Sequence, residues 1–431
     1  MHRPRPERHF TQCPRRRRQR EALSLSLLVA LGSAQLVRAE GLAPLTGALG
    51  ETKVLTDARL RFESVDQEPF VDEANAVTLR ARLGFETGKA WNTALLVEGE
   101  AVVPLQADYN STINGKTRYP IIADPKAFEL NRLQLTNTSI VDTTITLGRQ
   151  RIVLDDHRFV GNVGWRQNEQ TYDALRVVNK HIPNVTIDVS YLNQVNRVFG
   201  PDGLPGANDG RFTGDTVLAN VAWQTPMGKL TAFGYLIEFD QAPLPVRDST
   251  QTYGLRFQGE RPLSKLKLAY IASFAQQTDR GNNPLDFKNN FYMAELTGTY
   301  RQYSLGGGFE RLEGDGVKGF TTPLATLHRF QGWADKFLTT PVNGIVDLYA
   351  NAGFQKKGFG VLETLSLTAS WHDFESERLN LDYGQELDLQ LQGKFRRFTG
   401  TLKYADYEAA PTTPTTLRDT RKFWAQIDFA W

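Results

Sequence analysis

Short segments in which apolar and polar residues alternate recur from residue 54 to the end of the chain. Side chains on a β-strand point alternately to its two faces, so each segment predicts a strand with one apolar and one polar face. Almost no stretch has the i, i+3, i+4, i+7 spacing of an amphipathic helix. The pattern predicts about eighteen strands, at 54–65, 76–87, 90–103, 127–137, 141–153, 171–179, 185–195, 215–224, 229–239, 251–259, 264–277, 290–300, 301–312, 346–355, 361–374, 384–394, 396–408 and 420–431.

The connections between these segments alternate in length. Tight turns at 87–89, 225–228 and 300–301 are separated by long polar connections, at 104–126, 154–170, 197–214, 278–289, 313–345 and 409–419. Short turns at one end and long loops at the other are typical of outer-membrane barrels. The sequence therefore predicts an all-β fold, a transmembrane antiparallel β-barrel with short periplasmic turns and long extracellular loops.

The last predicted strand carries its own membrane signal. Phe423, Ala425, Ile427, Phe429 and Trp431 share one face, and the chain stops on the aromatic residue. An aromatic terminus suits the membrane interface. It also resembles the signal by which bacterial outer-membrane barrels are handed to their assembly machinery, so we expect that machinery as a partner, with the bilayer and lipopolysaccharide around the barrel.

The N-terminal segment is expected to be removed. A basic run at 15–20 precedes an apolar run at 22–36 and a small-residue site ending at Ala39, which together indicate a signal peptide at 1–39. We expect a short periplasmic segment at 40–53 and a single barrel domain at 54–431, located in the cell outer membrane of a Gram-negative bacterium.

Removing residues 1–39 changes the charge balance. This segment takes nine of the 50 basic and two of the 48 acidic residues, so the net charge changes from +2 to −5. The basic isoelectric point therefore gives no support for nucleic acid as a partner. The only cysteine, Cys13, is lost as well. No thiolate metal site is possible without it, and we expect no cofactor and no metal.

The alternation also assigns residues to the lumen. Apolar neighbours such as Leu79 and Leu83 face lipid, which leaves Arg80 inside, and the same parity places Arg59, Arg61 and Arg256 inside. Lumenal arginines offer bidentate hydrogen bonds to carboxylates and favour an anion-selective path. The alternative is that they pair with lumenal acidic residues and hold the shape of the barrel.

The segment around Gly148 departs from simple parity. Leu147 should face lipid, which would place Arg149 and Arg151 on the lipid side as well. A bulge at Gly148 would turn both arginines into the pore near its outer mouth. Without a bulge, they lie at the interface and extend to the lipid headgroups.

Three motifs resemble the alginate-export family of outer-membrane porins: 148–156 with 158–161 and 164–168, the loop 327–337, and the strand start 385–389. The resemblance implies an eighteen-stranded barrel whose pore is narrowed by inward loops and lined by basic residues, and which passes an anionic saccharide such as alginate. Arg149 is the best match to the family motif, Arg132 is a second, and Arg80 and Arg329 are weaker matches. With Arg151 and Arg256 they form the expected pore lining. The expected constriction loops contribute Arg158, Trp165, Arg166, His328 and Trp333.

A purely structural or adhesive barrel is one alternative. Its loops carry aromatic and basic clusters, Phe159 with Trp165 and Arg166 and Phe330 with Trp333 and Lys336, which bind a sugar or, as we expect, fold into the mouth. Two other functions remain open as well. One is an uptake porin for small anions or sugars, which shares the fold and the arginine lining. The other is an outer-membrane hydrolase, for which His157 and His372 beside carboxylates, with Ser370 near His372, are the candidates. That spacing places the nucleophile and the base on one strand, and no Gly-x-Ser-x-Gly pattern is present. We therefore expect a channel that is not an enzyme, with an anionic polysaccharide or oligosaccharide as its partner.

Overall fold

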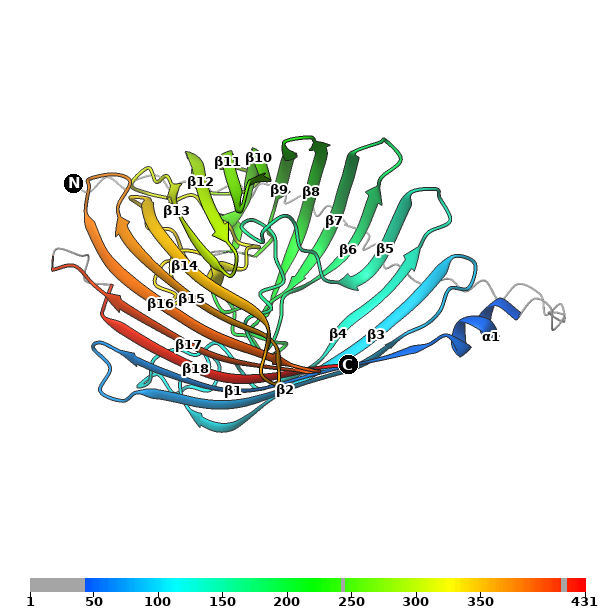
Figure 1. The fold of residues 1–431 in the computed structure, drawn as a ribbon, viewed down its shortest axis with the longest axis horizontal. Coiled ribbons are helices and arrows are strands. Elements are labelled where there is room, and N and C mark those ends of the chain that lie inside the picture. The colour runs from blue at the N-terminus through cyan, green and yellow to red at the C-terminus, as the bar shows by residue number, and fades with distance from the viewer. Residues whose placement is uncertain (1–42, 242–244, 412–416) are drawn as a thin grey trace, which may run out of the picture. The chain divides into compact units, whose positions relative to one another are not determined.

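Eighteen antiparallel strands close into a barrel in the computed structural model, which describes residues 43–241, 245–411 and 417–431 (Figure 1). The predicted signal peptide at 1–39 lies outside the described residues. Met1–Ala43 and Pro44–Trp431 separate as two units, and every strand belongs to the second. The all-β barrel prediction is confirmed.

Each predicted strand is present, with ends that differ by a few residues. Their bounds are β1 Lys53–Gln67, β2 Ala74–Glu86, β3 Thr93–Asp108, β4 Ala127–Asn137, β5 Thr143–Gln150, β6 Thr171–Asn179, β7 Val185–Asn196, β8 Arg211–Thr225, β9 Gly228–Ile237, β10 Thr250–Leu263, β11 Leu266–Asp279, β12 Lys288–Tyr300, β13 Tyr303–Leu312, β14 Ile345–Phe359, β15 Leu362–Glu375, β16 Asp382–Phe395, β17 Phe398–Glu408 and β18 Thr420–Ala430.

Strands β1 and β18 pair with each other and close the sheet. Arg59 lies opposite Asp428, and Arg61 lies opposite Gln426 in this register. Each of the other strands pairs with its two neighbours along the chain. The eighteen described strands leave no open edge, which is the condition for a sheet to stand in lipid.

The two faces of the sheet sort the side chains as the alternation predicts. Leu60, Leu79 and Leu83 lie on the outer face and are exposed, whereas Arg61 and Arg80 point inward and are buried. An Arg or Lys on the lipid face near mid-membrane costs roughly 2–4 kcal/mol. This cost accounts for the regular sorting of charged side chains to the lumen.

Helical structure is limited in the described residues. Helix α1, Ala43–Gly50, precedes β1, and two 3-10 helices occupy Pro245–Asp248 and Leu327–Arg329. Helix α1 lies within the segment 40–53, and β1 begins at Lys53. No helix among the described residues is long and apolar enough to cross a membrane.

Two long loops, at 151–170 and 313–344, fold into the lumen. They are joined by a short parallel bridge between Val160 and Leu324. In the first loop, Phe159 packs against Phe233 of β9 and Phe291 of β12, with ring centroids 5.0 and 5.2 Å apart. Both loops also contribute to the main cluster of buried apolar side chains inside the barrel. The lumen is therefore narrowed by packed segments of the chain.

Candidate functional site

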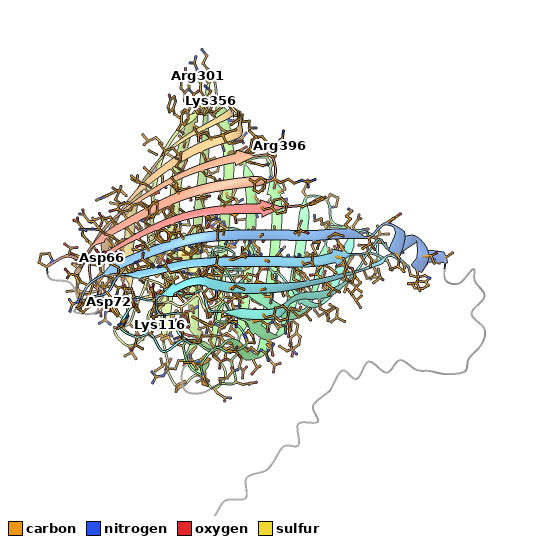
Figure 2. All side chains as sticks on the ribbon, turned by 90° about the horizontal axis from the view of Figure 1, so that it is seen from below. Asp66, Asp72, Lys116, Arg301, Lys356 and Arg396 are labelled. Carbon is orange, nitrogen blue, oxygen red and sulfur yellow. The ribbon has the colours of Figure 1, made fainter. Side chains whose placement is uncertain are left out.

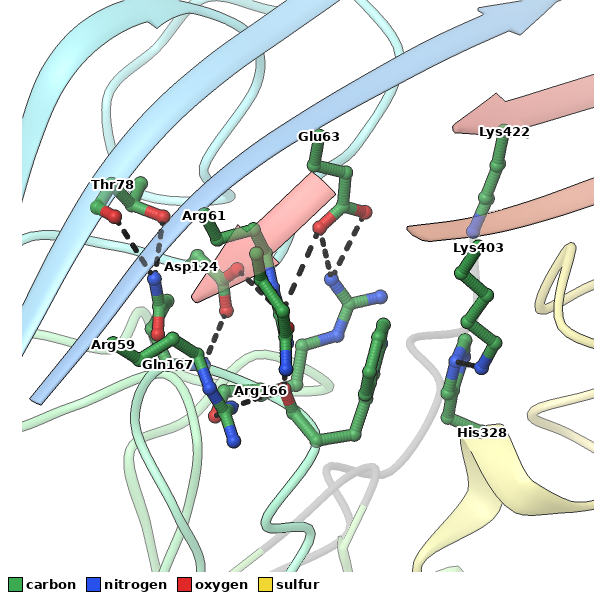
Figure 3. Close-up of polar contacts among 12 residues, drawn as sticks. Arg59, Arg61, Glu63, Thr78, Asp124, Arg166, Gln167, His328, Lys403 and Lys422 are labelled. Carbon is green, nitrogen blue, oxygen red and sulfur yellow. Dashed lines mark hydrogen bonds and ion pairs between the residues drawn. The ribbon is translucent and has the colours of Figure 1, made fainter. Parts of the chain in front are cut away.

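Two arginines of β1 hold the first inward loop by its backbone. One guanidinium nitrogen of Arg59 donates to the carbonyl oxygens of residues 164, 165 and 166, at 2.9–3.3 Å. Arg61 donates to the carbonyl oxygen of Trp165 at 2.5 Å and to the side chain of Gln426 at 2.8 Å. Arg59 and Arg61 extend below β1 in Figure 3. A hydrogen bond to a charged group contributes about 1.5–3 kcal/mol, so the two arginines hold the loop firmly to the wall.

Arg166 of this loop joins the wall to the second loop. Its guanidinium group lies 3.3 Å from the carboxylate of Glu63 on β1 and 2.9 Å from that of Asp335 in the second loop. Asp335 also accepts from Lys422 of β18 at 2.8 Å. These charged groups are buried, and a buried charge must be paired to be tolerated. The two loops are therefore held against each other by ion pairs.

His328 of the second loop lies at the contact between the loops. Its ring stacks on Trp165 with centroids 4.9 Å apart and an interplanar angle of 5°. Its Nδ1 lies 2.7 Å from Asp335, and its Nε2 lies 2.7 Å from Nζ of Lys403. Burial holds the pKa of His328 well below its usual range, so a neutral ring donates to Asp335 and accepts from the ammonium group.

Lys403 of β17 is enclosed by aromatic rings. Its ammonium group lies 3.6 Å from the ring centroid of Trp333, 4.2 Å from that of Trp165 and 5.4 Å from that of Trp424. Cation–π attraction is strongest for Trp and for a desolvated cation. The loop tryptophans therefore lie against the wall around a buried charge, as expected for residues that fold into the mouth.

A second set of ion pairs lies at the base of the first loop. Glu98 of β3 binds Arg132 at 2.6 Å, and Glu169 of the loop binds Arg151 at 2.5 Å. Although burial raises the pKa of Glu169, Arg82 and Arg151 lower it to about 2. Glu169 is therefore ionised at neutral pH and compensates nearby lumenal arginines.

The expected pore arginines are mostly paired with carboxylates. The pairs are Arg80 with Asp57, Arg132 with Glu98, Arg149 with Asp173, Arg151 with Glu169 and Glu98, and Arg256 with Asp156, and in the constriction loops Arg158 with Glu310 and Arg166 with Glu63 and Asp335. Most of the expected pore arginines thus pair with acidic residues, as in the alternative in which such pairs hold the shape of the barrel.

Arg149 requires a correction, because it faces outward. It lies in register with Leu133 of β4 and Asp173 of β6, and neither pairing shifts at Gly148. Its guanidinium group binds Asp173 at 2.7 Å. Gly148 has φ +113°, and a Cβ there would lie 2.2 Å from the carbonyl oxygen of Leu133. The glycine therefore permits close backbone approach without a bulge, and Arg149 does not line the lumen.

Arg151 turns inward by a different route. Strand β5 ends at Gln150, and the chain leaves the wall at once to begin the first loop. Arg151 then reaches Glu169 and Glu98, which are buried on the lumenal side. Arg329 is exposed on the second loop, and no ion pair with a carboxylate is recorded for it within the described residues.

A cavity of about 350 Å³ lies between the two inward loops, the loop at 197–210 and the wall. We call it the loop cavity. Its lining includes four cationic side chains and one carboxylate, namely Arg166, Arg197, Lys336, Lys422 and Asp335. Apolar side chains, including Phe199, Leu327, Leu338 and Leu417, complete the wall. Asp335 already binds Arg166 and Lys422, so the cavity holds an excess of positive charge.

Two of these cations have no carboxylate partner among the described residues. Arg197 donates to the carbonyl oxygens of Ala207 and Asp209, at 2.8 and 2.9 Å. Lys336 donates to the hydroxyl of Thr420 at 2.8 Å. Burial, and then the neighbouring Lys422, lower the pKa of Lys336 to about 8. Lys336 is therefore largely charged at neutral pH, and neither side chain is neutralised by a carboxylate among the described residues.

A second cavity, of about 400 Å³, shares Arg197, Pro323, Leu327 and Leu338 with the loop cavity. Its other charged lining residues are Arg158, Arg247, Lys318 and Asp248. Arg197 thus stands between two cavities in which cations outnumber carboxylates. No group of three or more His, Cys, Asp or Glu side chains in the described ranges is placed to hold a metal ion.

The sequence interpretation missed Arg197, Asp335, Lys403 and Lys422 as site residues, and Lys336 entered it only as part of an aromatic and basic loop cluster. Parity does place Lys403 and Lys422 in the lumen, since they alternate with Leu402 and Phe423. For Arg197 and Asp335 the deciding contacts join loops far apart in the chain, which no local pattern reveals.

The fold is similar to that of several solved bacterial proteins, among them the outer-membrane protein OpdK. OccAB3 of Acinetobacter baumannii superposes with a TM-score of 0.68 at 15% identity, covering 89% of this chain and 99% of that one. OccK5 (OpdH) of Pseudomonas aeruginosa gives 0.64 at 12%, over 89% and 99%. OpdK of the same organism, solved with vanillate, gives 0.64 at 12%, over 88% and 99%.

No protein-family model matches the chain, and no curated protein matches it either. The likeness to the solved structures therefore establishes the fold. Together with the closed sheet and its apolar outer face, it places the chain among multi-pass β-barrels of the outer membrane. The narrower resemblance to alginate exporters rests on the three sequence motifs alone.

Proposed function

We propose that this barrel is a passive outer-membrane channel for small organic anions, and that the loop cavity is where the anion binds. The observation that carries the proposal is a pair of cations, Arg197 and Lys336, in a cavity rich in positive charge. Neither has a carboxylate partner within the described part of the chain. Elsewhere in the lumen the basic side chains are largely neutralised by pairing. Selectivity in pores follows from such local excess charge.

The walls of the loop cavity favour an anion with an apolar body. Phe199, Leu327, Leu338 and Leu417 offer an apolar surface beside the cations. Small-molecule sites usually combine apolar walls with a few polar groups that fix orientation. A monocarboxylate with an aromatic or aliphatic body has both features. OpdK, which shares the fold, was solved with vanillate, a small aromatic carboxylate.

The size of the site supports a small solute over a polymer. A cavity of about 350 Å³ lies at the lower end of the range of roughly 300–1,000 Å³ that small-molecule sites span. The two inward loops are bridged at Val160 and Leu324 and locked by Arg166 and Asp335. A polyuronate would need a continuous groove past this contact. Polyuronate export, the function implied by the sequence resemblance, remains a prediction. The single-channel experiment described next tests it together with the proposal.

Current through single channels tests the proposal. The mature chain is inserted in a planar bilayer, and vanillate, vanillyl alcohol or a guluronate trisaccharide is added. We expect vanillate to interrupt the chloride current at concentrations where the alcohol, which lacks the carboxylate, has no effect. Equal effects of the acid and the alcohol would contradict charge recognition. Block by the trisaccharide without block by vanillate would favour the polyuronate.

A further inference from the structure

The periplasmic rim of the barrel carries a one-sided excess of positive charge. Four consecutive segments at the turns joining β10 to β17, at 260–267, 300–303, 355–363 and 394–398, contain nine Lys or Arg and two Glu residues, all of them exposed. The two acidic residues are paired, Glu260 with Lys267 and Glu363 with Lys394. Seven exposed cations remain. We call this surface the basic rim.

The turns between β2 and β9 on the same rim are balanced. The turns that join β2 to β9, at 86–92, 138–142, 180–184 and 225–228, contain two lysines, Lys89 and Lys180, and two carboxylates, Glu86 and Asp142. Figure 2 shows Arg301, Lys356 and Arg396 of the basic rim at one end of the strands, with Asp66 and Asp72 at the other end. The charge is thus confined to one sector of the periplasmic end.

The cations of the basic rim alternate with aromatic residues of the outer face. Arg301 lies over Tyr300 at 5.3 Å, Arg396 over Phe395 at 5.2 Å, and Arg397 over Trp431 at 4.0 Å from the ring centroid. Aromatic belts on barrels mark the level of the membrane interface. A cation held against such a ring lies at headgroup depth, with its charge directed to the polar layer.

We infer that the basic rim binds the headgroups of anionic phospholipids in the periplasmic leaflet. Charge complementarity supports this ligand, because seven unpaired cations face a layer in which phosphate groups are the available anions. The aromatic neighbours support a lipid over a partner within the periplasm, since they fix the cations at the edge of the hydrocarbon region. Lipids that bind here anchor one sector of the barrel, between β10 and β17, in the inner leaflet. The inference does not depend on the solute that the pore passes.

Spin-labelled lipids measure this binding directly. The mature chain is reconstituted in phosphatidylcholine bilayers, and electron paramagnetic resonance gives the relative association of labelled phosphatidylglycerol and labelled phosphatidylcholine. We expect the wild-type protein to favour phosphatidylglycerol. The triple variant R301Q/K356Q/R396Q is expected to lose most of this preference, because each cation near a membrane surface contributes up to about fivefold in binding of an anionic lipid.

Two controls keep the result specific. The variant K89Q/K180Q removes cations from the balanced part of the rim and is expected to retain the preference. The variant R301K/R396K keeps the charges and is also expected to retain it. Absence of a preference in the wild-type protein would overturn the inference, and so would an equal loss in K89Q/K180Q. Retention of the full preference in the folded triple variant would also overturn it.

Discussion

Replacement of Lys336 by glutamine removes one charge from the loop cavity and leaves the fold intact. Lys336 forms no ion pair among the described residues, and its one recorded hydrogen bond, to Thr420, can be made by an amide. A carboxylate about 4 Å from the ammonium group is attracted by roughly 4 kcal/mol at an effective dielectric constant of about 20. Desolvation offsets part of this attraction, and a charge-assisted hydrogen bond retains about 1.5–3 kcal/mol. We therefore expect K336Q to weaken vanillate binding by roughly 10- to 150-fold.

The pH dependence gives a second readout of the same group. Burial and Lys422 lower the pKa of Lys336 to about 8, and a bound anion must raise it again. The protonated form that binds the anion is therefore lost as the pH rises through about 8. Between pH 7 and pH 9 the charged fraction falls about tenfold, and we expect the affinity of the wild-type protein to fall by up to the same factor.

Isothermal titration of the detergent-solubilised protein, residues 40–431, with vanillate measures both effects. K336Q is expected to bind weakly at every pH, with a nearly flat profile over this interval. Lys116, a partly exposed lysine of the loop at 109–126 that does not line the loop cavity, provides the control, and K116Q is expected to behave as the wild-type protein. Wild-type affinity that does not change between pH 7 and pH 9, or K336Q binding equal to wild type, would refute the reasoning.

Three further predictions concern the constriction and the wall. R61Q removes the hydrogen bond to the carbonyl oxygen of Trp165 and is expected to loosen the first loop, so single-channel conductance should rise and fluctuate. An unchanged, steady conductance would show that Arg61 does not hold the loop. Because the pKa of Glu169 is lowered to about 2, its ion pairs are complete above about pH 4.5 and are lost only as the pH falls towards 2. Single-channel conductance should therefore stay constant from pH 7 to pH 5. A step in conductance in that interval that is absent in E169Q would contradict the lowered pKa of Glu169. G148A places a Cβ within 2.2 Å of the carbonyl oxygen of Leu133, at a backbone φ of +113°. This strain costs about 1–3 kcal/mol, so the temperature of heat-induced unfolding in a gel-shift assay should fall. An unchanged unfolding temperature would show that the backbone relaxes freely.

The alternation of residues was sufficient to predict the strands and their faces. Strands β4 and β6 begin and end at the predicted residues, and the seam places Arg59 opposite Asp428 as parity requires. A side-chain period of two is a local property, and lipid imposes it on every strand of a closed barrel. The positions of the strands and the faces of their side chains can therefore be predicted from the sequence alone.

The directions of Arg149 and Arg151 show where local reasoning ends. Both follow Gly148, yet Arg149 remains in the sheet and faces outward, whereas Arg151 lies beyond the end of β5 and turns inward. The sequence indicates a backbone irregularity at this glycine. Whether the irregularity is a bulge or a close approach to β4 depends on the register of a neighbouring strand.

The loop cavity lay beyond sequence analysis for a related reason. Arg197, Asp335 and Lys422 come from a loop, another loop and the last strand, and their contacts form only after the barrel closes. The motifs named Trp165 and His328 among the expected constriction residues, and the two rings stack on each other in the structure. Which cations remain unpaired is decided by these distant contacts, so it could not be predicted from the residue types.

The reversal potential across a bilayer tests the central claim most directly. A gradient of potassium vanillate is imposed on membranes that contain the wild-type channel, and the voltage at zero current gives the permeability of the organic anion relative to potassium. The account predicts a reversal potential of the sign set by vanillate permeation, and a shift towards zero in K336Q. A potential of the opposite sign, set by potassium, in the wild-type protein would contradict it.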